Sequence, residues 1–424
     1  MKKSYLFLIV SFILYSFTLK AQITVEAFPM NPQSGQYNYF GVRVTLAETY
    51  TDNVTVTGYI YDEGNGPNTN HPFTLTVPAG ELTAETAANF YQTDPTATAV
   101  AELGTLVVIY AGVPITYEAN GCILKFNSLG DLQAVLNQLD ADNDAYNDDF
   151  DNQYGHLSEE ELDEMDEQNE FDEFKTYKDF EALFGGFCSK RAEIEAVENA
   201  WLANNFTGTD PDDIDLTFDE AENTIFNNTY SFKIGNDLYQ LTSAGLYKNG
   251  VYQDDGGGGA RISTENNNLM FANLFDNTGY RYSGPFISGY VSNIWTDCKT
   301  NKRKKSPPIE VSSTRRFIQK VAISSIGVRT SIKGKIVHYK KKNGNWKRKK
   351  AEMAVGVNGP VYNLSCSSLG NKSKTNPNGA GYKKRKSLKV KEWDFGTIWK
   401  TYSGEVGTSF AAAGGYGNIF LLTW

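Results

Sequence analysis

The segment Ile332–Val355, IKGKIVHYKKKNGNWKRKKAEMAV, decides the fold of the C-terminal part of this chain. Two stretches of β-branched, aromatic and basic residues flank the dipeptide Asn343-Gly344. Asn-Gly suits a type I′ turn, whose two central residues need positive φ and which joins antiparallel strands directly. The sequence therefore predicts a β-hairpin here, and the lysines on both arms predict a compact β domain with strongly basic strands.

The composition of the whole chain also favours β structure. Aromatic residues make up 13% of the 424 residues and 38 residues are glycine, which suits β-rich extracellular modules better than a helical enzyme. Between Gln22 and Asn120, short strand-like runs such as Val54–Asp62 alternate with turn-rich pieces. This spacing is that of an immunoglobulin-like or fibronectin-like sandwich. We expect an α+β, mostly β fold.

Shifts in composition divide the chain into five segments. An apolar N-terminal segment comes first, and strand-like, acidic helical, strand-like and basic segments follow it. The expected parts are a signal peptide (1–21), a β-sandwich domain (22–120), an acidic helical region (121–223), a β-hairpin region (224–296) and a basic β-rich domain (297–424).

The first 21 residues have the pattern of a secretory signal peptide. Lys2 and Lys3 precede a mostly apolar stretch of 15 residues, Tyr5–Leu19, and Ala21 suits cleavage before Gln22. This stretch is shorter than the about 20 residues that a transmembrane helix needs. An uncleaved membrane anchor is the alternative. We expect a secreted or cell-surface protein with no membrane span after the signal is removed.

The acidic region has the periodicity of helices. Four leucines recur at helical spacing from Leu129 to Leu139, behind a capping-box sequence at Ser128–Asp131. Ser158 and Glu161 repeat the capping signal before a second acidic stretch. These leucines predict ordinary core-facing helix stripes.

Charge is split between two blocks of the chain. The stretch Asp140–Glu222 holds 28 acidic and 4 basic residues, a net charge of −24, and Asp297–Trp424 holds 27 basic and 6 acidic residues, a net of +21. The whole chain has a net charge of only −10. Such an asymmetry indicates either a polyanionic partner or the docking of one block on the other.

The basic block contains the strongest candidate for a binding surface. Cations that alternate with aromatic rings can hold phosphate or sulfate groups while the rings stack on bases or sugars. The alternatives are a solvated strand face with lysines as edge protection, or a surface neutralised by the acidic helices. The candidate polyanion-binding residues are Tyr339, Lys340, Lys341, Lys342, Trp346, Lys347, Arg348, Lys349, Lys350, Lys383, Lys384, Arg385 and Lys386.

A run of aspartates, DADNDAYNDDFDN, is the best metal candidate. Its spacing resembles an EF-hand-like loop and the calcium repeats of thrombospondin type 3 modules, because calcium prefers closely spaced oxygen ligands. Ala145 stands where the loop usually has glycine, and a solvated acidic connector is the alternative. The candidate ligands of a structural calcium ion are Asp140, Asp142, Asp144, Asp148 and Asp151.

Four cysteines allow two disulfides in an oxidising compartment, with three possible pairings. Cys298 with Cys366 is the favoured pair, because both lie in the basic block. Four buried free thiols are the alternative. The wide spacing and the lack of a CxxC motif argue against a zinc ribbon or a thioredoxin-type site.

No motif indicates a reaction. GTSFAAAGG, at 407–415, resembles the serine motif of subtilisin-like proteases, with Ser409 as nucleophile. A serine nucleophile needs a base and an orienting acid, and none of His71, His156 and His338 has the sequence context of the protease family. An enzyme is therefore not expected, and we assign no catalytic residue.

Parts of the chain resemble uncharacterised secreted proteins of Bacteroidota-type bacteria. The likeness is in the AQ at 21–22, in Phe184–Leu202, in Tyr230–Gly250 and in the basic stretch Arg315–Lys350. These proteins have no assigned activity, so the resemblance implies origin and localisation only.

We therefore expect a secreted or surface-associated binding or structural protein. Its basic domain would contact a polyanion such as an acidic glycan, lipopolysaccharide or extracellular DNA. Two alternatives stay open: an interaction protein whose acidic and basic blocks pair within or between chains, or a hydrolase without a recognisable motif.

Overall fold

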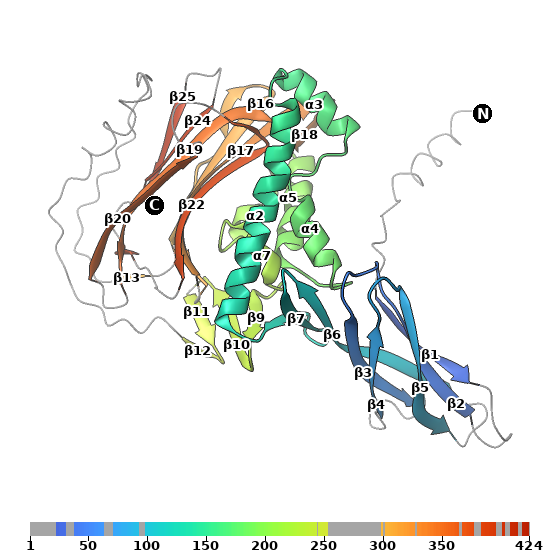
Figure 1. Cartoon of the computed structure of the whole chain (residues 1–424). Coiled ribbons are helices and arrows are strands. Elements are labelled where there is room, and N and C mark those ends of the chain that lie inside the picture. The colour runs from blue at the N-terminus through green and yellow to red at the C-terminus, as the bar shows by residue number, and fades with distance from the viewer. Residues whose placement is uncertain are drawn as a thin grey trace, which may run out of the picture. The chain divides into compact units, whose positions relative to one another are not determined.

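The fold is α+β and mostly β, with two compact units in one chain (Figure 1). One unit comprises Met1–Asn127 with Tyr177–Cys188, and the other comprises Ser128–Thr176 with Ser189–Trp424. The computed structural model describes residues 23–30, 38–62, 71–92, 98–243, 245–252, 298–299, 302–326, 329–363, 367–376, 383–395, 401–402, 408–413 and 418–423. The predicted signal peptide lies outside these ranges.

The first unit contains two antiparallel groups of strands. In sheet order, one is β1 (Thr24–Met30), β2 (Asn38–Thr45) and β5 (Thr83–Gln92). The other is β4 (His71–Val77), β3 (Val54–Asp62), β6 (Ala99–Tyr110), β7 (Val113–Glu118) and β8 (Ile123–Phe126).

Strict alternation builds the core of this unit. Val54, Val56 and Ile60 of β3 are fully or almost fully buried, while the alternate residues Thr55, Thr57 and Tyr59 are more exposed. Gly58 sits at a bulge between β3 and β6, and a Cβ there would lie 2.0 Å from the carbonyl oxygen of Glu102. Only glycine fits this close approach of two backbones.

The second unit begins with helices. Most helices start at a side-chain cap; Ser158 and Glu161 form the reciprocal capping box that the sequence predicted, and Ser128 also caps its helix. In the described ranges the helices are α2 (Leu129–Tyr154), α3 (Glu159–Gln168), α4 (Lys175–Ala182), α5 (Lys190–Ala203), α6 (Pro211–Ile214) and α7 (Glu220–Ile225). From Tyr177 onward, α4 belongs to the first unit.

A short antiparallel meander follows the helices. Its strands are β9 (Ser231–Ile234), β10 (Asp237–Thr242), β11 (Gly245–Lys248) and β12 (Val251–Tyr252). A hairpin joins β9 to β10, inside the β-hairpin region expected at 224–296, and its turn residue Gly235 has a φ of 57°.

The basic block forms two larger sheets and a short strand pair. The first sheet contains β14 (Lys302–Lys305), β15 (Ile309–Ser312), β16 (Arg315–Ser325), β17 (Arg329–Lys342), β18 (Asn345–Arg348) and β22 (Ser387–Phe395). The second contains β19 (Ala351–Tyr362), β20 (Ser368–Asn376), β21 (Lys383–Arg385), β24 (Thr408–Ala413) and β25 (Asn418–Thr423), while β13 (Cys298–Lys299) pairs with β23 (Thr401–Tyr402).

The hairpin predicted at Asn343-Gly344 is confirmed. It joins β17 to β18, with Lys342 paired to Asn345, and both turn residues have positive φ, 52° and 84°. This is the backbone that a type I′ turn requires.

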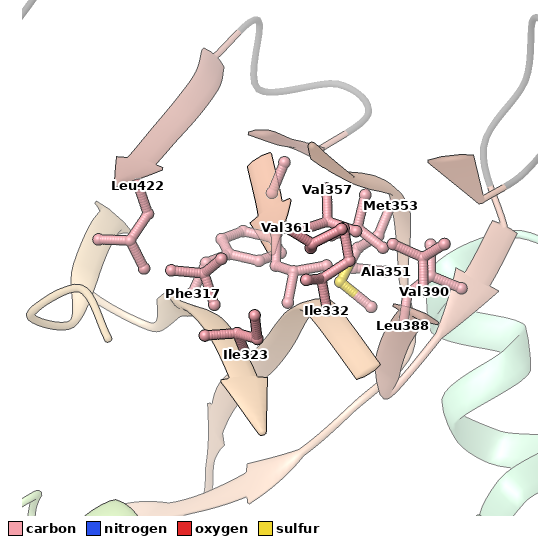
Figure 2. Close-up of a cluster of buried hydrophobic side chains, with 14 residues drawn as sticks. Phe317, Ile323, Ile332, Ala351, Met353, Val357, Val361, Leu388, Val390 and Leu422 are labelled. Carbon is pink, nitrogen blue, oxygen red and sulfur yellow. The ribbon is translucent and has the colours of Figure 1, made fainter. Parts of the chain in front are cut away.

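An apolar core lies between the two larger sheets (Figure 2). Phe317 of β16 and Ile332 of β17 meet Met353 and Val357 of β19 there. Because side chains alternate along a strand, the opposite face of β16, β17 and β22 must turn away from this core. That second face carries Lys320 of β16, Arg329, Lys333 and Lys335 of β17, and Lys389 and Lys391 of β22.

Among the helices in the described ranges, none combines the length and the apolar character needed to cross a membrane.

Candidate functional site: an acidic layer on a basic sheet

Strand β17 separates charge from apolar surface by simple alternation. Ile332 and Ile336 lie in the core between the sheets, so Arg329, Lys333 and Lys335 extend from the other face. All three cations are nevertheless buried. Burial of a cation is costly without a paired anion, so the layer that covers this face must supply carboxylates.

Strand register places four lysines in one row across the sheet. Lys305 of β14 pairs with Lys320 of β16, Lys320 pairs with Lys335 of β17, and Lys335 pairs with Lys389 of β22. Neighbouring strands lie about 4.8 Å apart, and like charges directly opposite each other are destabilising. This row could not form in isolation without a strong repulsion between its members.

Carboxylates of α6 and α7 neutralise this row. Lys320 forms an ion pair with Asp212, which is only 3% exposed, and Glu220 pairs with both Lys335 and Lys389, the latter at 3.2 Å between Lys389 Nζ and Glu220 Oε2. Burial alone would raise the pKa of Glu220, but Lys335 and Lys389 outweigh burial and hold the pKa below its ordinary value.

A second cluster of cations and carboxylates lies beside this lysine row, further along the same strands. Arg329 Nη2 donates to Glu222 Oε1 at 3.0 Å, and Lys333 Nζ donates to Glu222 Oε2 at 2.7 Å. Asp219 lies 3.1 Å from Lys391 Nζ, and the side chains of both acids have no exposed surface. Burial favours the neutral form of Asp219, but the surrounding cations outweigh it and hold the pKa of Asp219 well below its ordinary value.

Arg303 of β14 fixes the end of α6 through its backbone. Its guanidinium donates to the carbonyl oxygens of Asp212 at 2.9 Å and Asp213 at 3.2 Å, and to that of Asp215. These carbonyls lack partners inside so short a helix. Arg303 therefore holds the acidic turn in place without using a carboxylate.

Helix α3 covers the hairpin of β17 and β18. Lys340 Nζ donates to Asp163 Oδ2 at 2.9 Å, and Lys342 Nζ and Lys349 Nζ donate to Glu167 at 2.9 and 3.1 Å. Glu167 is 53% exposed, in contrast to the acids of α7. The two ends of the basic sheet are thus covered at different depths.

Glu198 of α5 joins two of the predicted binding residues. The hydroxyl of Tyr339 donates to Glu198 Oε1 at 2.6 Å, and Arg348 Nη2 donates to Glu198 Oε2 at 2.7 Å. Trp346 is buried in a cluster with Trp201 and Phe206. These rings are therefore core residues, and their faces are not an open stacking platform.

The lysine-rich stretch around β21 contacts α2, α3 and the residues between these helices. Arg385 Nη2 lies 2.5 Å from Asp148 Oδ1, Lys383 Nζ lies 2.8 Å from the same atom, and Lys386 Nζ lies 3.1 Å from Asp166 Oδ2. Lys384 donates to two backbone carbonyls, those of residues 155 and 157.

Lys350 differs from the other lysines in its surroundings. Its Nζ lies 3.8 Å from the centroid of the Phe150 ring and 3.6 Å from Asp151 Oδ1. Burial lowers the pKa of Lys350 to about 8, although Asp166 and Asp151 oppose the shift.

Two of the predicted polyanion-binding residues have different environments. Lys341 Nζ lies 5.7 Å from the centroid of the Trp346 ring, and Lys347 is exposed at the hairpin. The remaining eleven predicted residues contact the helical layer or its flanking loops, or lie in the aromatic core beneath it.

The predicted calcium loop is corrected by the structure. Residues 140–151 belong to the continuous helix α2 and not to a loop, because no glycine or proline interrupts the helix there. Asp140, Asp148 and Asp151 instead pair with cations of the basic block, while Asp142 accepts a hydrogen bond from Gln138 at 2.6 Å.

Asp144 also lies on this helix, at an exposed position. Within the described ranges, no group of three or more His, Cys, Asp or Glu side chains is arranged to hold a metal ion.

One disulfide, Cys122–Cys188, lies within the first unit, with a Cα–Cα distance of 6.0 Å. Sequence spacing gave no reason to prefer it, because 66 residues separate the two cysteines. The pair favoured by the sequence, Cys298 with Cys366, lies outside the residues whose side chains the structure describes.

Ser409 has a structural environment. Its side chain is fully buried, and Gln319 Nε2 donates to Ser409 Oγ at 3.1 Å and to its carbonyl oxygen at 2.7 Å. His338, also buried, has Nδ1 2.8 Å from the carbonyl oxygen of Lys349 and stacks on Phe317. The pairing of a serine with a histidine that a protease needs is not formed by these residues.

The sequence analysis missed the deepest cations and the acids that face them. From Arg329 to Ile336, polar residues at odd positions alternate with apolar or small residues at even positions. This alternation is the sequence signal that could have found part of the missed set. The missed residues are Arg303, Lys305, Arg315, Lys320, Arg329, Lys333, Lys335, Lys389, Lys391, Glu198, Asp212, Asp219, Glu220 and Glu222.

Comparison with known proteins gives no functional assignment. No family model matches the chain, and no curated protein matches it. Among solved structures, the chain is similar to a DUF4848 family protein from Bacteroides thetaiotaomicron, at 14% sequence identity over 73% of this chain and 98% of that one, with a TM-score of 0.16. That protein comes from a Bacteroidota-type bacterium, as the sequence resemblance implies, but so low a TM-score carries no argument about fold or function.

Proposed function

We propose that this chain is an extracytoplasmic structural or interaction protein, without catalytic activity, whose acidic and basic blocks pair with each other inside one chain. The observation that carries the proposal is the burial of Asp219 and Glu222. Neither carboxylate has exposed surface, and between them they contact Arg329, Lys333 and Lys391.

Energetics supports a structural use of this pairing. A buried ion pair gains little over apolar residues of the same shape, but removal of one partner leaves an uncompensated buried charge. A polyanion that approached the lysine row from Lys305 to Lys389 would first have to displace the carboxylates of the protein that already pair with these lysines. The paired layer therefore favours a closed, self-neutralised module over an open polyanion site.

Two features support an extracytoplasmic location. The disulfide Cys122–Cys188 suits an oxidising compartment. The apolar stretch Tyr5–Leu19 after two lysines has the pattern of a signal peptide. An oxidising location also makes acidic glycans and released DNA the relevant competitors for the basic face.

The decisive experiment compares binding of heparin and duplex DNA by the full chain and by a variant of α3. In the variant, Glu159→Gln removes a partner of Arg315 of β16, and Asp163→Asn and Glu167→Gln remove partners of the hairpin lysines, while α7 stays in place. We expect weak binding by the native chain and clearly tighter, salt-sensitive binding by the variant, since polyanion binding weakens as salt rises.

A matched control has the same change in net charge. Asp149→Asn, Glu164→Gln and Glu170→Gln alter three exposed acids of the same region and should leave heparin binding close to native. If the native chain already binds heparin tightly at about 0.15 M salt, the basic face is open and the polyanion hypothesis replaces this proposal.

A further inference from the structure

Lys350 is a buried lysine whose ammonium group is poorly satisfied. The residue lies just before β19 and is 1% exposed. Among the described residues, its Nζ has no hydrogen-bond partner, whereas Lys333, which is buried to the same degree, donates three hydrogen bonds. A buried charge without hydrogen bonds is costly. The ion pairing that accounts for the other deeply buried lysines therefore does not fully account for Lys350.

Aromatic rings surround this amine. Nζ lies 3.8 Å from the centroid of the Phe150 ring and 4.3 Å from that of the Phe171 ring, and both rings belong to an apolar cluster with Leu162. The faces of the rings attract an ammonium group, but they cannot accept its protons as water would. A lysine that is desolvated in an apolar pocket loses its proton more easily and then acts as a nucleophile.

Two carboxyl groups flank the amine. Lys350 Nζ lies 3.6 Å from Oδ1 of Asp151, near the end of α2, and 3.9 Å from Oδ1 of Asp166, in α3. Asp166 is the more deeply buried of the two, 3% exposed against 20% for Asp151. Its Oδ1 also has no hydrogen-bond partner in the described part of the chain, and burial raises its pKa. An amine, a carboxyl group that can be attacked and a second carboxyl group that can carry a proton are thus brought together.

Arg385 of β21 holds Asp151 from another side. Its Nε lies 2.8 Å from Asp151 Oδ2, whereas Lys350 approaches Oδ1. A guanidinium group at this oxygen fixes the carboxyl group and stabilises negative charge that develops on it. Arg385 also pairs with Asp148, so its position does not depend on Asp151 alone.

We propose that the side chains of Lys350 and Asp151 condense to form an amide bond within the chain. This inference goes beyond the proposed function, because it concerns one covalent bond made once in each molecule. The bond joins the last turns of α2 to the start of β19, two elements about 200 residues apart in the sequence. It fixes the acidic helix to the basic sheet in a way that salt cannot screen.

The bond forms with the loss of one water molecule. Asp166 takes a proton from the Lys350 ammonium group and passes it to Asp151 Oδ1, which leaves an amine beside a neutral carboxyl group. The amine nitrogen attacks Cγ of Asp151, and Arg385 stabilises the oxyanion on Oδ2. Asp166 carries a second proton from the nitrogen to Oδ1, the bond between Cγ and Oδ1 breaks, and this oxygen leaves as water. One hydrogen stays on the amide nitrogen and Asp166 returns to its starting state, so the reaction needs no oxidant and no cofactor.

The test is the mass of the intact full chain under denaturing and reducing conditions. We expect the native chain to lack one water molecule, about 18 Da, relative to Lys350→Arg after the substitution itself is allowed for. Arginine keeps the positive charge but has no amine at this position. Lys347→Arg, at an exposed position of the hairpin, is the matched control and should keep the deficit. Tryptic digestion of the native chain should yield a branched peptide joined through Lys350 and Asp151.

A second variant separates proton transfer from packing. Asp166→Asn keeps the size of the side chain and leaves both bonded residues in place, but it cannot carry the proton. We expect it to fold, as followed by circular dichroism, and to contain about tenfold fewer linked chains at equal times after synthesis. A purely structural role of Asp166 would leave the linked fraction unchanged.

A folded native chain with the full mass of its sequence overturns the proposal, and so does a deficit that survives Lys350→Arg. A branched peptide that joins Lys350 to Asp166 overturns the assignment of Asp151 as the acceptor. If Lys350→Arg does not fold, the branched peptide of the native chain still decides, because its detection needs no variant.

Discussion

Glu222 is the residue on which the charged layer of the second unit depends most. Its two oxygens accept from Arg329 and Lys333, and all three side chains are excluded from water. In such a buried site, water screens the attraction between Glu222 and the two cations only weakly. The repulsion between Arg329 and Lys333 that remains when the carboxylate is lost is also weakly screened. Burial, more than the number of ion pairs, sets the importance of each acid.

A conservative substitution measures this effect of burial. Glu222→Gln keeps the size of the side chain but removes its charge, and we expect the free energy of unfolding to fall by about 3 kcal/mol. Glu167→Gln removes the pairs with Lys342 and Lys349 at a site that is 53% exposed, and should change stability by only about 1 kcal/mol, because water screens both pairs. Urea unfolding followed by tryptophan fluorescence measures both, and equal losses would contradict the argument.

His338 gives the fold a pH dependence of its own. Burial lowers the pKa of His338 to about 4, against an ordinary 6.5. Since the folded-state pKa is depressed, the contribution to stability is complete above pH 6.5 and is lost as the pH falls toward 4. Between pH 7 and pH 5 this amounts to about 2 kcal/mol for the single group.

Substitution of His338 isolates this contribution from that of the carboxylates. We expect His338→Gln to lose less stability than the native chain when urea unfolding is compared at pH 7 and pH 5. The carboxylates are common to both proteins, so the difference between the two pH responses belongs to the histidine. An unchanged response in the variant would show that the buried ring does not titrate in this range.

At the scale of elements, the two larger sheets approach each other closely at Gly334. A Cβ on this residue would lie 2.8 Å from Ser409 Oγ and 2.9 Å from the carbonyl oxygen of Gly356. Gly334→Ala should force the sheets apart and destabilise the protein by about 2 kcal/mol. Gly130→Ala in the first turn of α2, where a Cβ would meet only Ser128 Oγ at 3.6 Å, should be neutral or slightly stabilising. Thermal unfolding of both variants tests the contrast.

Local elements were predictable from the sequence where the signal is local. The turn at Asn343-Gly344 and the capping box of Ser158 depend on residues within four positions, and both are confirmed. The row of lysines depends on strand register, which is set by pairing across tens of residues. The calcium loop predicted for the aspartates from 140 to 151 was wrong. That prediction rested on the spacing of possible ligands, whereas the segment has no glycine and continues as a helix.

At the scale of the second unit, ion pairs that are buried to different depths should respond differently to salt. At 1 M NaCl the Debye length is about 3 Å, so exposed pairs such as Lys342 with Glu167 are screened, while the fully buried pairs of α7 are not. Amide hydrogen exchange of α3 should therefore accelerate several-fold between 0.1 and 1 M NaCl, while α7 and β17 keep their protection.

Exchange followed by mass spectrometry resolves these elements in one intact protein, and α5 serves as an internal control because Trp201 and Leu202 anchor it through apolar contacts that salt does not weaken. If α7 loses protection together with α3, the acidic layer detaches as one body, and the basic sheet becomes available to an external polyanion at high ionic strength. If only α3 responds, α7 is a permanent part of the fold, because its carboxylates are the counter-charges without which the lysine row cannot be buried.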